Sequence, residues 1–399
     1  MKVLQINSVC GIGSTGRIAT DLHNILLKQG HESYIAYGRD EPQNCDTAIK
    51  IGSKFDNYSH VTLTRISDRH GFGSKKVTRE FIKEVERINP DIIHLHNIHG
   101  YYINIQILFE YLKKTDKPVI WTLHDCWSFT GHCSHFDFIS CNKWETGCFK
   151  CPQKKEYPTS LILDNSENNY LMKKELFKGV KNLTIVTPSE WLAKLVKKSF
   201  LSEYAVKVIN NGIDLNLFKP TESDFKKKNN LTESFIILGV ASGWSERKGF
   251  KHFMELSKRL KENEQIILVG LSEKQKKGLP ANIIGITRTN NIKELAELYS
   301  LADVFLNPTL EDNFPTTNLE ALACGTPVVT FNTGGSVESI SSETGFIVTQ
   351  GNMDQVVNSI RNVKLNGKGK YTEKCIERTA LFYDNQKCFK EYINLFSKR

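Results

Sequence analysis

Residues 1–26 read MKVLQINSVCGIGSTGRIATDLHNIL and join a strand pattern to a helix pattern through a glycine-rich loop. Apolar residues dominate the start of this stretch, as in a buried strand. From Ile18 to Leu26 the apolar residues recur at the spacing of one helix face, and Gly30 is a suitable helix stop. The stretch predicts the first strand, loop and helix of a doubly wound α/β domain.

The same alternation of strand and helix patterns continues along the chain. In the first half, strand patterns occupy 32–38, 91–97 and 119–125, helix patterns occupy 77–90 and 104–118, and residues 180–200 read as a further strand, turn and helix. In the second half, strand patterns occupy 234–242, 265–270, 281–286, 303–309 and 326–331, and helix patterns 248–262, 292–302 and 316–325. Alternation of this kind predicts right-handed βαβ units and parallel sheets with helices on both faces.

A polar stretch, TESDFKKKNNLTE at 221–233, separates the two series. We therefore expect an N-terminal domain over residues 1–210 and a C-terminal domain over residues 211–383. Asn211 and Gly212 suit a tight turn or a left-handed backbone at the linker. The tail, residues 384–399, is amphipathic and is expected to form a helix that packs back on the N-terminal domain.

Composition bounds the class of protein. The 399 residues carry a net charge of +9, from 53 basic and 44 acidic residues, which suits anionic headgroups or phosphorylated substrates. No arginine-rich arm, zinc-finger pattern or ribonucleoprotein motif points to nucleic acid. No run of ~18 apolar residues predicts a membrane span, and the short polar N-terminus is unlike a signal peptide. These features predict a cytoplasmic location.

The loop GIGSTG, residues 11–16, matches the G-x-G-x-x-G pattern of dinucleotide-binding folds. An oxidoreductase that uses NAD is therefore one interpretation. Such a protein needs an acidic residue at the tip of the second strand. Here Asp40 comes late, after Gly38 and Arg39, and this interpretation leaves the second half of the chain unexplained.

The densest chemical pattern is NPTLEDNFPTTNLEALACGTPVVTFNTGGSVE, residues 307–338. A strand ends in an acidic loop, and Thr316 or Thr317 can cap a helix that stops at Gly325. Asp312 and Glu320 bracket the start of this helix. A helix N-terminus attracts phosphate, and carboxylates accept hydrogen bonds from sugar hydroxyls. The alternative is that these acids are merely solvated surface residues.

This segment resembles the signature of family 4 retaining glycosyltransferases of the GT-B fold, in which two acidic residues are separated by seven positions. Asp312 and Glu320 have that separation, with Asp at the first position where the family usually has Glu. The resemblance implies two Rossmann-like domains facing across a cleft. Motifs in the same order span nearly the whole chain, and those of the first half resemble a bacterial branch that builds capsule, exopolysaccharide and O-antigen chains.

The resemblance also implies roles for particular residues of the second half and of the glycine loop. Glu320 would bind the ribose hydroxyls of the donor, and Asp312 its sugar. The family usually has an arginine five residues before Lys248, where this chain has Gly243, so Arg247 is the substitute. The predicted donor-binding residues are Gly13, Arg17, Arg247, Lys248, Asn313, Phe314, Thr316 and Glu320.

Histidines end two strand patterns of the first half. His94 alternates with apolar residues and is expected to be a buried, hydrogen-bonded side chain. The resemblance places His124 beside the transferred sugar as a catalytic residue, together with Asp312 and Glu320. Asp125 and His96 are expected on the side of the acceptor.

The reaction implied is transfer of a sugar from a UDP- or GDP-sugar to a hydroxyl of a lipid-linked oligosaccharide, with retained anomeric configuration. The resemblance implies front-face attack without a protein nucleophile and without a catalytic metal or other cofactor. A catalytically inactive sugar-nucleotide-binding protein is a third interpretation. Peripheral contact with the inner face of the cytoplasmic membrane would follow from such an acceptor, and the basic amphipathic segment 190–201 is one place for it, although an ordinary surface helix is favoured there.

Four of the ten cysteines cluster in residues 131–152: Cys133, Cys141, Cys148 and Cys151. Only the last pair has the two-residue gap of a zinc knuckle. Four thiolates suit a structural zinc ion, and the alternative is reduced thiols that pack as small apolar groups.

Overall fold

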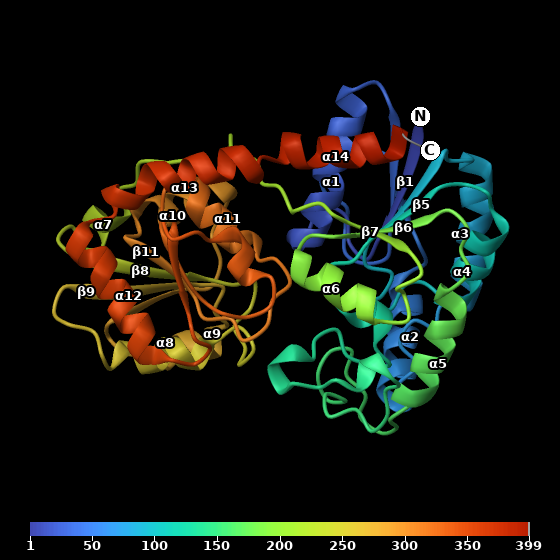
Figure 1. Cartoon of the computed structure of the whole chain (residues 1–399), viewed down its shortest axis with the longest axis horizontal. Coiled ribbons are helices and arrows are strands. Elements are labelled where there is room, and N and C mark those ends of the chain that lie inside the picture. Colours follow the sequence, from blue (N-terminus) through green and yellow to red (C-terminus); the bar gives the residue numbers. More distant parts are fainter. Residues whose placement is uncertain (398–399) are drawn as a thin grey trace. The chain divides into compact units, whose positions relative to one another are not determined.

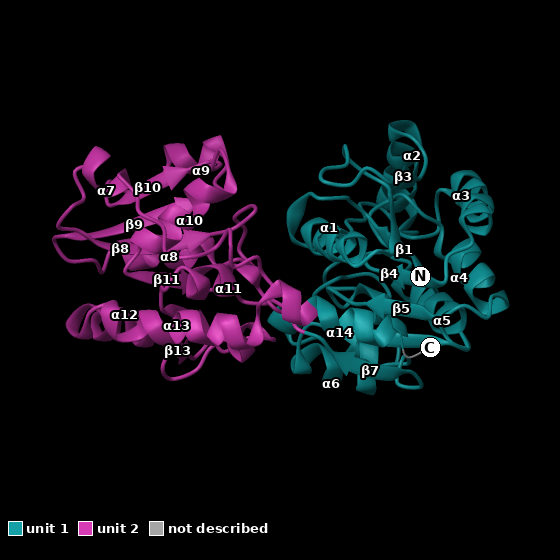
Figure 2. Cartoon of the chain, turned by 90° about the horizontal axis from the view of Figure 1, so that it is seen from above, with its two compact units in different colours: residues 1–209, 389–399 teal, residues 210–388 magenta. Residues whose placement is uncertain are grey.

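Each of the two units of the chain is built on one parallel sheet (Figure 1). The computed structural model describes residues 1–397. Unit 1 comprises Met1–Ile209 and the residues from Phe389 onwards, and unit 2 comprises Asn210–Cys388 (Figure 2). The predicted class, two doubly wound α/β sheets, is confirmed.

The sheet of unit 1 has seven strands in the order β3-β2-β1-β4-β5-β6-β7, and all neighbours are parallel. The strands are β1 (Lys2–Asn7), β2 (Glu32–Tyr37), β3 (Ala48–Lys50), β4 (Ile92–Leu95), β5 (Val119–Thr122), β6 (Leu183–Thr187) and β7 (Ala205–Val208). The strand order changes direction between β1 and β4, because β2 and β4 lie on opposite sides of β1.

Helices cover both faces of this sheet (Figure 1). They are α1 (Gly13–Lys28), α2 (Lys54–Ser67), α3 (Lys75–Ile88), α4 (Ile105–Lys114), α5 (Ser166–Phe177), α6 (Glu190–Lys198) and α14 (Asn385–Ser397). On one face, Leu22 of α1 and Phe389 of α14 share a core with Val3 and Ile120. On the other, α3, α4 and α5 pack on the alternate side chains of the strands, such as Trp121.

The sheet of unit 2 has six parallel strands in the order β10-β9-β8-β11-β12-β13. The strands are β8 (Phe235–Val240), β9 (Glu264–Val269), β10 (Ile283–Ile286), β11 (Val304–Asn307), β12 (Val328–Phe331) and β13 (Gly345–Val348). The helices are α7 (Phe225–Lys228), α8 (Phe250–Ser257), α9 (Glu273–Lys277), α10 (Ile292–Leu301), α11 (Thr316–Ala323), α12 (Met353–Asn366) and α13 (Gly369–Phe382). The strand order again changes direction at one point, between β8 and β11.

Among the described residues, six helices have no counterpart in the sequence patterns quoted above: α2, α5, α7, α9, α12 and α13. Helix α2 begins at a capping box in which Ser53 and Asp56 satisfy each other's backbone amides. Its large apolar residues Phe55, Tyr58 and Ile66 are exposed, while His60 and Thr64 are buried. Helix α2 therefore turns polar residues toward the protein and apolar residues toward solvent. A search for an apolar face directed at the core does not find it.

The linker glycine Gly212 has a different purpose from the one predicted. Neither Asn211 nor Gly212 adopts a positive φ. A Cβ on Gly212 would instead lie 2.5 Å from the Cα of Asn385. The backbone of Ile213 pairs there with that of Tyr383 and Asn385, so glycine allows two chain segments to approach closely.

His60 in α2 makes the stability of the chain depend on pH. Its Nε2 accepts hydrogen bonds from the amides of Gly71 (3.1 Å) and Gly73 (3.3 Å), and its Nδ1 lies 2.9 Å from the Ser74 hydroxyl. Burial lowers the pKa of His60 from 6.5 to about 4. Below pH 6.5 this histidine is therefore protonated in the unfolded chain, whereas in the folded chain it stays neutral down to about pH 4.

We expect the free energy of unfolding to fall as the pH drops from 6.5 to 4, with a contribution from His60 on the order of 3 kcal/mol. Urea denaturation at several pH values measures it. In a His60→Asn variant the fall over this window is expected to be smaller than in the wild type. Equal pH dependence in the two proteins would contradict this role of His60.

Candidate functional site

Two loops meet at the carboxyl edge of the sheet of unit 2, where the strand order changes direction. Strand β8 lies between β9 and β11, so the residues that follow β8 and β11 flank the same point. Ligands of open α/β sheets bind outside the carboxyl ends of the strands at such points. The loops 241–249 and 308–315 therefore form the candidate site of unit 2.

Hydrogen bonds between these loops position two cations. The guanidinium of Arg247 donates to the backbone carbonyl of Glu311 at 2.8 Å, and the amide of Leu310 donates to the carbonyl of Arg247 at 2.8 Å. The Nζ of Lys248 lies 2.5 Å from Oδ2 of Asp312, with side-chain exposures of 26% and 16%. Lys248 is thus oriented by a carboxylate and is still open to solvent, so that an anionic ligand can compete for it.

Glu320 is buried in α11, one turn beyond the start of this helix, with 3% of its surface exposed. Its Oε2 accepts a hydrogen bond of 2.8 Å from the hydroxyl of Tyr299 in α10. The predicted threonine cap is wrong, because Pro315 is the N-cap and makes no side-chain cap hydrogen bond, and Thr316 is the first helical residue. The start of α11 therefore keeps backbone amides that no capping side chain satisfies, a feature that favours an anion.

The loop that leads into α11 is held from two sides. The amide of Gly335 donates to the carbonyl of Asp312 at 3.1 Å, and the side chain of Asn211 donates to the carbonyl of Phe314 at 3.3 Å. The side chains of Asn313 and Phe314 are buried. Contact of their backbone amides with a ligand stays a prediction.

A pocket that the sequence patterns did not reveal lies over the ends of β8, β9 and β10. Trp244 forms part of its wall, and its indole N–H donates to the carbonyl of Val269 at 2.9 Å. Gln275 donates to the carbonyl of Trp244 at 3.1 Å. The lining residues are Ser242, Gly243, Trp244, Phe250, Met254, Gly270, Leu271, Ser272, Lys274, Gln275, Gly278 and Thr287. A ligand with a planar ring and polar edges suits this lining.

In unit 1, histidines at the ends of β4 and β5 form a hydrogen-bonded chain. Gln5 donates its amide to the carbonyl of Ala19 at 3.0 Å, so its Oε1 accepts from His96 Nε2 at 3.0 Å. Burial lowers the pKa of His96 well below 6.5, so its Nδ1 carries no proton and accepts from His124 Nε2 at 3.1 Å. Burial also lowers the pKa of His124 to about 4. His124 is therefore a neutral imidazole with its proton on Nε2.

His94 is fully buried, and its Nε2 lies 2.8 Å from the hydroxyl of Thr122, which confirms the prediction of a hydrogen-bonded core histidine. Asp125 has a partner that sequence reasoning missed: His99 Nε2 lies 2.9 Å from its Oδ2. The amide of Trp127 donates to Oδ1 at 2.9 Å. Burial raises the pKa of Asp125, but the neighbouring His99 outweighs it and the pKa falls to about 2. Asp125 is thus a carboxylate at neutral pH.

The glycine loop packs closely against the backbone of Gln43, which is distant in the sequence. Gly11 has a φ of +75°, and a Cβ there would lie 2.3 Å from the carbonyl of Gln43. Gly13, with a φ of +65°, begins α1, which has no side-chain cap at Ile12. Arg17 follows one turn later and is partly exposed. The start of α1 can therefore receive an anion, while Gly11 serves close packing.

The four clustered cysteines line one small cavity of unit 1, and all are free thiols. The amide of Gly131 donates to the sulfur of Cys148 at 3.2 Å. Within residues 1–397, no group of three or more His, Cys, Asp or Glu side chains is arranged to hold a metal ion. The structure therefore gives no support to the predicted structural zinc site.

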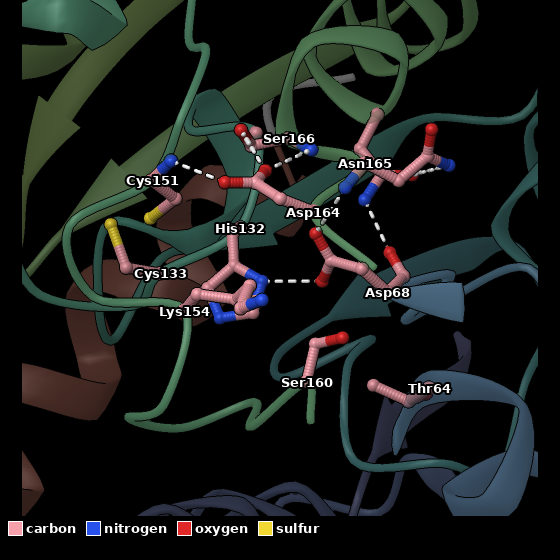
Figure 3. Close-up of polar contacts among 12 residues, drawn as sticks. Thr64, Asp68, His132, Cys133, Cys151, Lys154, Ser160, Asp164, Asn165 and Ser166 are labelled. Atoms are coloured by element: carbon pink, nitrogen blue, oxygen red, sulfur yellow. Dashed lines mark hydrogen bonds and ion pairs between the residues drawn. The ribbon is translucent and has the colours of Figure 1, made fainter. Parts of the chain in front are cut away.

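Carboxylates hold the cysteine-rich loop in place instead (Figure 3). Asp68, at the end of α2, pairs with Nδ1 of His132 and accepts a hydrogen bond from the amide of Asn165 at 2.9 Å. Asp164 accepts from the amide of Cys151 at 2.6 Å and from the amide of Ser166 at 3.0 Å. These contacts fix the loop to both α2 and α5.

Two family descriptions together match most of the chain. Residues 15–217 match "Glycosyltransferase Family 4", and residues 221–381 match "Glycosyl transferases group 1". The putative colanic acid biosynthesis glycosyl transferase WcaC of Escherichia coli is 26% identical over 99% of both chains. A UDP-Gal:alpha-D-GlcNAc-diphosphoundecaprenol alpha-1,3-galactosyltransferase of Escherichia coli is 25% identical over 42% of this chain and 47% of its own length.

Solved structures share the fold at lower identity. Sucrose-phosphate synthase from Thermosynechococcus elongatus has a TM-score of 0.75 at 16% identity, covering 100% of this chain and 99% of its own. HepE from Anabaena, solved in complex with UDP-glucose, has a TM-score of 0.69 at 15% identity and covers 100% of both chains.

The protonation of His124 can be tested directly by nitrogen-15 NMR of a histidine-labelled sample. We expect the Nε2–H tautomer at neutral pH and a pKa of about 4, because burial disfavours the imidazolium and His96 accepts the Nε2 proton. In a Gln5→Leu variant, His96 loses the acceptor of its Nε2 proton, and the tautomer preference of both histidines is expected to weaken. An Nδ1–H tautomer of His124 in the wild type would contradict the chain described above.

Proposed function

The chain belongs to the glycosyltransferases of family 4, and from this premise we propose that it transfers a sugar from a nucleotide-sugar donor to a hydroxyl of a lipid-linked oligosaccharide during synthesis of a bacterial surface polysaccharide. Its activity is that of a glycosyltransferase, and its two Rossmann-like sheets are those of the GT-B fold. The name of the matched undecaprenol-linked transferase supports the lipid-linked acceptor, and that of the matched colanic acid transferase supports a role in polysaccharide synthesis.

The pairing of Lys248 with Asp312 at the switch point of unit 2 is the observation that carries the proposal. A departing nucleoside diphosphate gains negative charge in the transition state. Lys248 and Arg247 supply positive charge, and the uncapped start of α11 supplies backbone amides. The diphosphate of the donor would replace Asp312 as the partner of Lys248. Asp312 would then accept hydrogen bonds from the hydroxyls of the sugar.

We assign recognition of the nucleoside to two further parts of unit 2. Glu320, held by Tyr299, would accept hydrogen bonds from the ribose hydroxyls. The pocket beside Trp244 would take the base, because its wall combines an aromatic ring with the polar side chains of Ser272 and Gln275. The complexes of HepE with UDP and UDP-glucose favour a uridine donor over a guanosine donor.

Unit 1 contributes a neutral imidazole and a carboxylate to the proposal. His124 cannot serve as a general acid near neutral pH, since its pKa is about 4. We propose that it accepts a hydrogen bond from a hydroxyl of the transferred sugar, with His96 fixing its orientation. Asp125 would orient the acceptor hydroxyl, and Gly13 and Arg17, at the start of α1, would contact the phosphate of the donor.

Retention of configuration needs no protein nucleophile in this proposal. The acceptor hydroxyl attacks from the face that the diphosphate leaves, and a phosphate oxygen takes its proton. The chain's residues bind the donor, stabilise the leaving group and exclude water. Within residues 1–397, no helix combines the length and the apolar character of a membrane span.

We propose that the enzyme works at the inner face of the cytoplasmic membrane, because a lipid-linked acceptor would lie there.

Thermal-shift and transfer assays against a panel of UDP- and GDP-sugars test the proposal, with NAD as the competing ligand. A rise in melting temperature with a UDP-sugar and release of UDP are expected. Stabilisation by NAD alone would favour the oxidoreductase interpretation, and UDP-sugar binding without turnover under any acceptor would favour an inactive binding protein.

Lys248→Ala is expected to lower the rate of transfer by about 10²-fold, because it removes a cation from the leaving group. Lys251→Ala is the matched control, since Lys251 lies on α8 and pairs with Glu246 on the surface. A rate that falls equally in both variants would remove the special role of Lys248.

Glu320→Gln is expected to raise the KM for the donor at a nearly unchanged melting temperature, because glutamine still offers an acceptor to Tyr299. Tyr299→Phe should lower the stability by about 1 kcal/mol, the net value of one hydrogen bond, and change the KM less. A ribose role for Glu320 would be rejected if both variants changed only the stability.

A further inference from the structure

We propose that an apolar and basic surface of unit 1, formed by one face of α2 and by residues 161–163, docks the enzyme on an anionic phospholipid bilayer. We call it the α2 surface. It rests on the proposed function in one respect, since a lipid-linked acceptor would lie in that bilayer. Its apolar members are Phe55, Tyr58, Ile66, Leu161, Ile162 and Leu163.

The exposure of these side chains is the first argument. They are between 49% and 78% exposed, with Ile66 the least and Phe55 the most exposed. Phe55, Tyr58 and Ile66 lie on one stripe of α2, because residues at these spacings share a helix face. His60 and Thr64, on the opposite face, are buried. The helix thus turns these large apolar side chains to solvent, and exposed apolar surface of this kind marks interaction with a membrane or a partner.

Backbone hydrogen bonds place the irregular segment 161–163 beside the C-terminal end of this stripe. The amide of Leu161 donates to the carbonyl of Arg65 at 2.7 Å, and the amide of Leu163 donates to the carbonyl of Ile66 at 3.1 Å. The pairing of Asp68 with His132 and its hydrogen bond to Asn165 fix the same end of α2 to the neighbouring loop (Figure 3). The surface is therefore preformed and needs no folding step on binding.

Charge selects a bilayer as the occupant. The basic residues next to the apolar members are Lys54, Arg65, Arg69, Lys154 and Lys155. Of the acids in these segments, Asp56 is engaged with Ser53 in the cap of α2, Asp68 is buried and paired with His132, and Glu156 is exposed. Basic side chains that surround aromatic and branched apolar residues fit anionic headgroups above an acyl interior. A second copy of the chain would present the same positive charge and be repelled.

The amphipathic helix α6, which the sequence offered as a place for membrane contact, is less suitable. Its apolar residues Leu192 and Val196 are fully buried in the core of unit 1. Trp191 and Leu195 are only partly exposed and pack against the same core, so the exposed lysines have little apolar surface beside them. The structure favours the ordinary surface-helix interpretation of α6 and directs attention to α2.

Co-sedimentation of the full chain with vesicles tests the proposal. Wild-type protein is expected to bind vesicles of phosphatidylglycerol mixed with phosphatidylethanolamine, to bind phosphatidylcholine vesicles weakly, and to dissociate as salt is raised. For a variant with Phe55→Ser, Tyr58→Ser, Leu161→Ser and Ile162→Ser, we expect the partition coefficient onto these vesicles to fall by at least about tenfold. Lys54→Gln with Arg69→Gln should remove the preference for the anionic lipid.

Leu365→Ser with Leu381→Ser is the matched control, because these exposed leucines lie in unit 2, and its vesicle binding should equal that of the wild type. Unchanged binding by the α2 variant, or no wild-type binding to anionic vesicles, would overturn the proposal. So would size-exclusion chromatography in which the wild type is a dimer and the α2 variant a monomer. The thermal shift of each variant with a UDP-sugar separates this test from that of the proposed function, since it does not depend on the bilayer.

Discussion

Parallel pairing of the strands is the constraint on which the arrangement of functional residues depends. In a parallel sheet every strand ends at the same edge, so loops far apart in the chain meet there. In each unit the order of strands changes direction once, between β1 and β4 and between β8 and β11. The loops on either side of that change diverge and leave space for a ligand. The glycine loop with His96, and Lys248 with Asp312, occupy these two positions.

Polar groups at both positions are held by partners before any ligand arrives. Lys248 is paired with Asp312, Glu320 with Tyr299, and Asp125 with His99. In unit 1 the chain from Gln5 through His96 fixes the tautomer of His124. Burial without such partners would be costly, because an unsatisfied polar group loses the hydrogen bonds it made with water. The two units differ in the groups that they offer: unit 2 offers the cations Arg247 and Lys248, and unit 1 offers a neutral, oriented imidazole.

Helix α14 connects the last part of the chain to the first sheet. Its buried residues Phe389, Tyr392, Ile393 and Phe396 pack with α1 and with side chains of β1, β4 and β5. The hydroxyl of Tyr392 lies 3.1 Å from that of Thr122, which also contacts His94. The C-terminal residues thereby support the strand that carries His124. Truncation of this helix would therefore uncover the core of unit 1 and disturb the site above it.

The sequence by itself determined the alternation of strands and helices, the two α/β series, the amphipathic tail and the two acids of the donor motif. Each of these features depends on the spacing of residues that are close together in the chain, so periodicity and turn residues reveal it. It could not give the partner of each side chain, because Lys248 and Asp312, Gln5 and His96, or His99 and Asp125 are distant in the chain and meet only when the sheets form. Nor could it decide which face of α2 meets water: an apolar stripe has the same spacing whether it is buried or exposed, and only the packing of His60 and Thr64 against the protein turns Phe55 and Tyr58 outward.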